Sequence, residues 1–243
     1  MGLSQKLHTT STGASHWYRP DDMKSLGINA RHRRYRTSGF SLLEMTMVMA
    51  IMIVVASISF MSLQPMLKAQ RVTNAYNTTL SALRMARDSA VAQRTSYHLV
   101  FISTATSNTI TVSPTLSTFQ GAQSPVTYSL PFDVAFSAQL GIPTNNTPDG
   151  FGSGLAAIDF GYTAQGTGTG GETDLYFCPD GSVQDATGGA GNCSGNWNSG
   201  VVYIARPGEL LSSRALTVWG GTGRIRGWRL YDNGSGGVFW QRM

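Results

Sequence analysis

The sequence is poor in the residues from which most metal sites and catalytic centres are built. It has 243 residues but only four His and two Cys, and three of the His lie within the first 39 residues. The rest of the chain therefore cannot supply a His/Cys zinc site or a four-Cys iron–sulfur cluster. The remaining His98 lies in an alternating run at 97–101 that predicts a strand, so we interpret it as structural. We expect no enzymatic activity and no cofactor.

Charge is also scarce. Charged residues make up 13% of the chain and hydrophobic residues 41%, which excludes a disordered chain and a coiled coil. The formal net charge of +5 lies entirely in residues 1–39, and residues 40–243 are neutral as a whole. Within that neutral part, residues 40–200 carry −4 and residues 201–243 carry +4. The overall basicity therefore does not by itself indicate a nucleic-acid binder.

The longest hydrophobic run covers residues 40–63 and contains one charged residue, Glu44. As a helix this run is about 36 Å long, enough to cross a hydrocarbon core of about 30 Å. Basic residues at 31–36 predict a cytoplasmic N-terminus, with everything after Leu63 exported. An ordinary signal peptide or single-span anchor is the alternative. The length of the run and the cost of a carboxylate near a bilayer argue against it.

The string Gly39-Phe40-Ser41-Leu42-Leu43-Glu44-Met45 closely resembles the processing site of type IV prepilins and type II secretion pseudopilins. The resemblance implies that a prepilin peptidase cuts between Gly39 and Phe40 and N-methylates Phe40. It also implies that Glu44 of one subunit neutralises the Phe40 amine of a neighbour when the stems assemble into a filament. The implied partners are that peptidase, the inner membrane and other pilins or pseudopilins at a filament tip.

Three segments follow from this resemblance: a leader at 1–39, a stem helix at 40–94 that crosses the inner membrane over 40–63, and an exported domain at 95–243. The leader is longer than is usual for the family and contains two acids. A start at Met23 would leave a leader with five basic residues and no acidic ones. We therefore expect translation to begin at Met23.

The stem is expected to continue as an amphipathic helix, with Pro65 kinking or locally interrupting it. Residues 66–94 contain no Gly or Pro, and Arg84, Arg87 and Arg94 are interpreted as solvated or capping charges. Apolar residues that step by three or four mark one face: Val72, Tyr76, Leu80, Leu83, Ala86 and Ala90. The stretch 83–92 resembles the helix that follows the stem in the GspH/FimT branch of minor pilins.

The exported domain has no long helical pattern, so we predict an antiparallel β fold packed on the helix and an α+β fold overall. Strand-like runs alternate with Gly, Pro, Asn and Ser: 97–103, 109–114, 126–130, 155–162, 173–178, 200–205, 214–219 and 224–231. The stretches 141–154 and 186–200 predict loops.

Cys178 and Cys193 both follow the membrane segment, in what would be an oxidising compartment. We expect a disulfide between them, with two free thiols as the alternative.

Two further patterns carry little weight. Gly166, Gly168 and Gly171 spell G-x-G-x-x-G but lead into a strand rather than a phosphate-binding helix. Four acids could bind calcium through oxygen ligands, although their spacing does not match an EF-hand and ordinary turn acids are the alternative: Glu172, Asp174, Asp180 and Asp185.

The basic C-terminal region contains a more informative pattern. Alternation along a strand places Arg224, Arg226 and Trp228 on one face. Guanidinium groups beside an aromatic ring can contact the phosphates and bases of DNA. The Gly-Arg-x-Arg pattern resembles the C-terminal motif of FimT-like minor pilins that capture DNA. An arginine-lined solvent face, or a contact with another pilin, is the alternative.

The sequence thus predicts a non-enzymatic minor pilin or pseudopilin of a type IV pilus-like or type II secretion filament. A FimT-like pilin that binds DNA for uptake is the alternative, and an anchored envelope enzyme is the least favoured class.

Overall fold

The computed structural model describes residues 39–115, 124–165, 167–189 and 191–243. The predicted leader at 1–39, including Met23, lies outside the described residues except for Gly39. The chain divides into two compact units, one ending at Ile53 and one covering Val54–Met243. One helix and two antiparallel sheets make an α+β fold, as the sequence predicted.

The helix, α1 (Leu42–Gln93), has two parts with different surroundings. Its N-terminal part is apolar and exposed, with a mean hydropathy of 2.3 over 18 residues, so it is long and apolar enough to cross a membrane. The helix continues through Pro65, and the local interruption predicted there is absent from it. A proline removes one backbone hydrogen bond, and at this exposed position the flanking turns maintain the helix.

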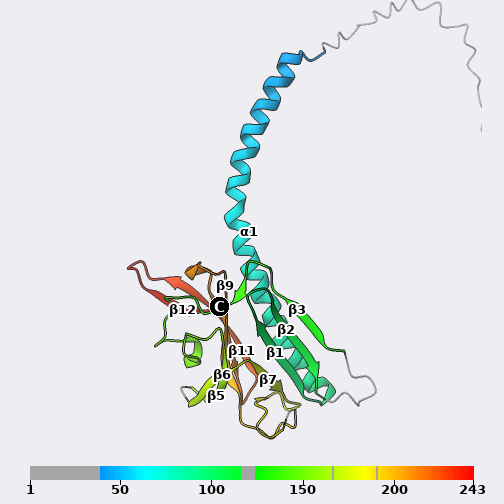
Figure 1. Ribbon diagram of the computed structural model, residues 1–243, viewed down its shortest axis with the longest axis vertical. Coiled ribbons are helices and arrows are strands. Elements are labelled where there is room, and N and C mark those ends of the chain that lie inside the picture. Colours follow the sequence, from blue (N-terminus) through cyan, green and yellow to red (C-terminus); the bar gives the residue numbers. More distant parts are fainter. Residues whose placement is uncertain (1–38, 116–123, 166, 190) are drawn as a thin grey trace, which may run out of the picture. The chain divides into compact units, whose positions relative to one another are not determined.

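Two sheets form the β-rich part of the chain (Figure 1). The first has the spatial order β3 (Val126–Ser129), β2 (Asn108–Pro114), β1 (Tyr97–Ser103), β7 (Asp174–Phe177) and β8 (Val183–Gln184). The second has the order β12 (Val238–Arg242), β11 (Arg224–Asp232), β10 (Arg214–Trp219), β9 (Ser199–Ala205), β5 (Ile158–Ala164) and β6 (Thr167–Glu172), and β4 (Ala135–Phe136) also pairs with β9. Two short 3-10 turns, η2 (Pro148–Gly150) and η3 (Leu210–Ser212), lie in the connections.

The C-terminal part of α1 packs against both sheets and closes the main core. Five of the six residues predicted to form its apolar face are buried, and Leu80 is partly buried against the same cluster. Strand residues such as Leu99 of the first sheet and Val202 of the second belong to that cluster. Burying this shared apolar surface is the main force that holds the helix and the sheets together.

A close approach occurs between α1 and β11. A Cβ atom added at Gly227 would lie 1.8 Å from the hydroxyl oxygen of Tyr76. Any larger residue at position 227 would therefore displace the ring of Tyr76 from its place against the backbone of β11. This contact fixes the position of β11 against the helix, and with it the arginines that this strand carries.

The predicted disulfide between Cys178 and Cys193 is present and joins residues 15 positions apart. It connects the end of β7 to the loop between β8 and β9.

Replacing Cys178 and Cys193 together by Ser should lower the free energy of unfolding by about 3 kcal/mol, because the open loop increases the entropy of the unfolded chain. Chemical denaturation of the full chain in neutral detergent measures this change. An exposed Ser235→Ala variant is the control, with an expected change below about 0.5 kcal/mol. Equal stability of the double variant and the control would contradict a stabilising bridge.

Candidate functional site: an arginine groove

A tight turn at residues 220–223 joins β10 to β11 and brings the hairpin next to α1. The amide of Gly223 donates a hydrogen bond of 2.7 Å to the carbonyl of Trp219. Gly223 has a φ of +58°, and a Cβ there would lie 2.0 Å from the Gly181 carbonyl and 2.9 Å from Nε of Arg87. Glycine is therefore required both by the backbone conformation and by the close approach of the Gly181 carbonyl and the Arg87 side chain.

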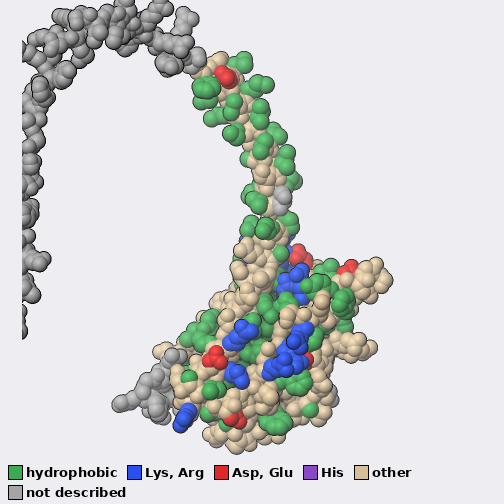
Figure 2. Space-filling view, turned by 180° about the vertical axis from the view of Figure 1, so that it is seen from behind, with side chains coloured by type: hydrophobic (Ala, Val, Ile, Leu, Met, Phe, Trp, Pro, Cys, Tyr) green, Lys and Arg blue, Asp and Glu red, His purple; other side chains and the backbone are tan. Residues whose placement is uncertain are grey.

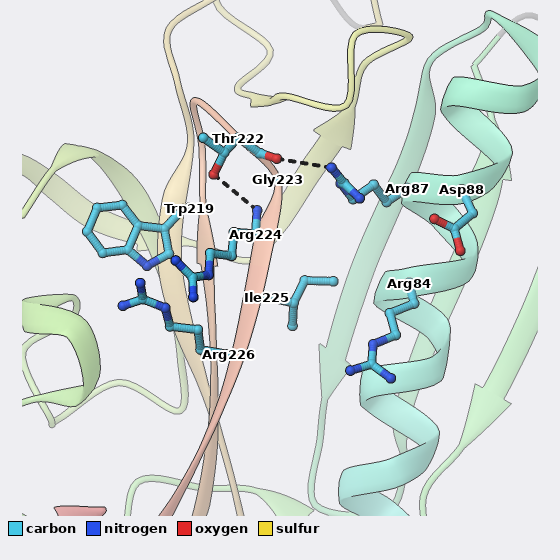
Figure 3. Close-up of a pocket in the computed structure, with 9 residues that line it drawn as sticks. All are labelled: Arg84, Arg87, Asp88, Trp219, Thr222, Gly223, Arg224, Ile225 and Arg226. Carbon is cyan, nitrogen blue, oxygen red and sulfur yellow. Dashed lines mark hydrogen bonds between the residues drawn. The ribbon is translucent and has the colours of Figure 1, made fainter. Parts of the chain in front are cut away.

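Between the helix and this hairpin lies a groove of about 580 Å³. We call it the arginine groove, because Arg84 and Arg87 enter it from α1 and Arg224 enters it from β11 (Figure 3). Arg87 donates a hydrogen bond of 3.3 Å to the carbonyl of Thr222. None of these three arginines forms an ion pair within the described part of the chain. Lys and Arg side chains also gather on one face of the Val54–Met243 unit (Figure 2).

Arg226, the second arginine of the predicted pair, also lines this groove, but its charge has a partner. Arg226 forms an ion pair with Asp149, whose side chain is only 5% exposed. Asp149 also accepts hydrogen bonds from the hydroxyl of Thr217, at 2.6 Å, and from the indole of Trp219, at 3.0 Å. The guanidinium of Arg226 lies 5.3 Å from the centre of the Trp219 ring. Its charge is therefore largely satisfied inside the protein.

Trp228 is held in a similar way. Its indole N–H donates a hydrogen bond of 3.2 Å to the Thr217 hydroxyl, and its ring packs against the smaller of the two core clusters. The aromatic ring that lines the arginine groove is instead that of Trp219. The three residues predicted to share a face thus lie along one strand, but only Arg224 is exposed and free of an ion pair.

Sequence reasoning missed Arg84 and Arg87 as groove residues. Arg87 was interpreted as a solvated or capping charge, whereas it is half-buried and binds the hairpin turn. The available signal was their spacing of three residues, which places both side chains on the same side of a helix. The hairpin that completes the groove is distant in sequence: Thr222 lies 135 residues after Arg87.

The residues of the predicted processing site lie at the start of α1. Gly39 and Phe40 are exposed and precede the helix, and Glu44 is exposed in its first turn. Glu44 and Lys68 are the first and second charged residues after position 39, so the helix between them carries no charge.

The other candidate residues lie elsewhere. His98, on β1, contacts the carboxylate of Asp174 at 2.8 Å and stacks on Tyr176.

The acids considered for calcium are engaged separately: Glu172 with Asn198, Asp180 with Ser182, and Asp185 with Thr187 and Asn196. Burial, together with the charges of Asp185 and Asp174, raises the pKa of Glu172. No group of three potential metal ligands occurs among the described residues.

Comparison of the chain with protein-family models, with curated proteins and with solved structures finds no match.

Replacing Asp149 by Ala should destabilise the protein by about 3 kcal/mol, because it leaves Arg226 half-buried without a counter-charge. Thermal or chemical denaturation measures the loss. The matched control is Asp88→Ala, which removes an exposed carboxylate that lines the same groove and should change stability by less than about 0.5 kcal/mol. Equal effects of the two changes would show that the Asp149–Arg226 pair has no structural role.

Proposed function

We propose that this chain is a non-enzymatic minor pilin or pseudopilin. A prepilin peptidase would cut it between Gly39 and Phe40 and methylate the new amino terminus. The apolar part of α1 would then hold it in the inner membrane, with residues 95–243 on the outer side, until it joins a type IV pilus-like or type II secretion filament.

The observation that carries this proposal is the position of Glu44. Its carboxylate lies in the first turn of α1, whose exposed apolar N-terminal part carries no other charge before Lys68, and it follows the proposed cut by a few residues. The positive end of the helix dipole offsets part of the cost of that charge. In a bundle of such helices a counter-charge is still needed, because a lone carboxylate in an apolar medium is strongly destabilising. The cationic amine that cleavage creates at Phe40 supplies one.

Replacing Glu44 by Ala should leave cleavage after Gly39 intact but reduce incorporation into filaments at least about tenfold, because the Phe40 amine of a neighbour then lacks its partner. Mass spectrometry of the protein from its native host reports cleavage and methylation, and immunoblotting of sheared filaments reports incorporation. Thr46→Ala, a change in the same turn that removes no charge, is the control.

Two outcomes would contradict the proposal. One is normal incorporation of the Glu44→Ala variant. The other is a mature native protein that still carries residues 23–39 ahead of Phe40. Co-purification with secretion pseudopilins or with pilus subunits assigns the filament to one of the two machines.

The arginine groove favours a second candidate function, capture of DNA. Three arginines without ion pairs, next to Trp219, suit a phosphate backbone with an adjacent base. Arg226 contributes less than the sequence pattern suggests, because Asp149 already neutralises it. This function is compatible with a minor pilin, since the groove lies between β11 and the C-terminal part of α1, outside the apolar run at 40–63.

If the groove binds DNA through its three arginines, the full chain in neutral detergent should bind a short duplex with a slope of log K against log salt of about −3. Replacing Arg84 and Arg224 by Gln should reduce the magnitude of this slope by about two, whereas Arg242→Gln, an exposed charge outside the groove, should leave it nearly unchanged. Fluorescence anisotropy measures both. Absent or salt-insensitive binding would rule out this function.

A further inference from the structure

A second groove lies between α1, η3 and the end of the β10–β11 pair that is far from the turn at 220–223. It has a volume of about 320 Å³, and Lys68, Arg214 and Arg229 supply its charge, with Leu211 at its side. Arg214 and Arg229 are direct partners in the register between the two strands. We propose that this groove binds the phosphate of an anionic phospholipid headgroup.

The charge in the groove is uncompensated. None of its three cations forms an ion pair within the described residues. Glu209, the carboxylate that also lines it, instead pairs with Arg206. Burial and the neighbouring charge of Arg229 lower the pKa of Arg214. Two adjacent guanidinium groups held in this way repel each other, and an anion between them relieves the repulsion.

The donors in the groove also lack acceptors. The NH1 atom of Arg214 and the Nε atom of Arg229 are buried and have no hydrogen-bond partner among the residues that the structure describes. A buried donor without a partner costs free energy, and more so when it is charged. A phosphate presents several strong acceptor oxygens and a negative charge, and planar guanidinium groups match its geometry.

The position of the groove along the chain favours a lipid as the source of that phosphate. Lys68 follows the end of the apolar run at Leu63 by five residues, a distance of about 7.5 Å along a helix. If the apolar run spans the bilayer, Lys68 lies at the level of the headgroups, where basic residues attract anionic lipids. Leu211, which is 50% exposed, and Phe132, which is 90% exposed, are apolar side chains suited to that interface.

Phe132 is connected to the groove by a chain of contacts. The guanidinium of Arg71 lies 4.9 Å from the Phe132 ring, and Arg71 and Arg206 both bind Asp133. Arg206 in turn pairs with Glu209, the one carboxylate among the described residues that line the groove. Two exposed apolar side chains, Leu211 and Phe132, thus accompany a groove whose three cations have no ion-pair partner among the described residues.

The test uses the full chain in neutral detergent, titrated with short-chain phosphatidylglycerol and with short-chain phosphatidylcholine. Native mass spectrometry counts the bound lipids and gives the affinities. Phosphatidylglycerol should bind at least about tenfold more tightly, because the positive choline group is repelled by the three cations. Equal binding of the two lipids would overturn the proposal.

Variants locate the binding. Replacing Arg214 and Arg229 by Gln should weaken phosphatidylglycerol binding at least about tenfold. The control, Arg84→Gln with Arg224→Gln, removes the same charge from the arginine groove and should change binding less than about twofold. Equal losses in the two double variants would show a diffuse charge effect and overturn the proposal.

If the double variant fails to fold, Lys68→Gln provides the test instead. Lys68 is exposed, so its replacement should not affect folding. It should weaken binding about fivefold, and unchanged affinity would contradict the assignment.

Competition distinguishes the sources of phosphate. Inorganic phosphate should displace the lipid only at millimolar concentration, and a DNA duplex should not displace it. Displacement by either at the concentration of the lipid would overturn the lipid assignment. The test is independent of the filament proposal, since Glu44→Ala should bind phosphatidylglycerol normally.

Discussion

The packing of one narrow face of α1 against two sheets is the interaction on which the rest of the structure depends. Four alanines on this face, Ala75, Ala82, Ala86 and Ala90, are completely buried in the core cluster that the helix forms with both sheets. Without the helix, each sheet would expose an apolar face to water. The C-terminal part of α1 is therefore an integral part of the globular fold.

This packing also creates both basic grooves. The strand β11 packs against α1 at Gly227, which accommodates Tyr76, and the two ends of β11 lie beside widely separated turns of the helix. Arg224 near one end meets Arg84 and Arg87, and Arg229 toward the other end meets Lys68. Each groove thus combines charges that are far apart in sequence and that only the contact between helix and strand brings together.

Much of the fold could be predicted from the sequence, because it depends on local patterns. Period-two alternation indicated the longer strands, and steps of three and four indicated the buried face of α1. The prediction missed β4 and β8, which have two residues each, and β12, which has five. It also missed β6, where Gly168, Gly170 and Gly171 adopt positive φ values and provide no side chains that would reveal a pleated strand.

The candidate sites were less predictable. Alternation correctly placed Arg224 and Arg226 on one strand, but the charge of Arg226 is satisfied by Asp149, which lies 77 residues earlier in a loop. Asp149 itself has a left-handed backbone conformation, with a φ of +55°. No local pattern reveals an ion pair of this kind, since it depends on how a loop folds over a sheet. The pairing of Arg214 with Arg229 likewise required the register of the β10–β11 hairpin.

The distribution of burial along α1 has a practical consequence for handling the molecule. Every described side chain from Gly39 to Gln70 is exposed, and Val72 is the first residue of the helix that is buried. A recombinant chain that starts just before Lys68 would keep each residue of the hydrophobic core. It would lose the exposed apolar N-terminal part of α1, which promotes aggregation. Such a truncated fragment would be suited to crystallisation and solution spectroscopy in plain aqueous buffer.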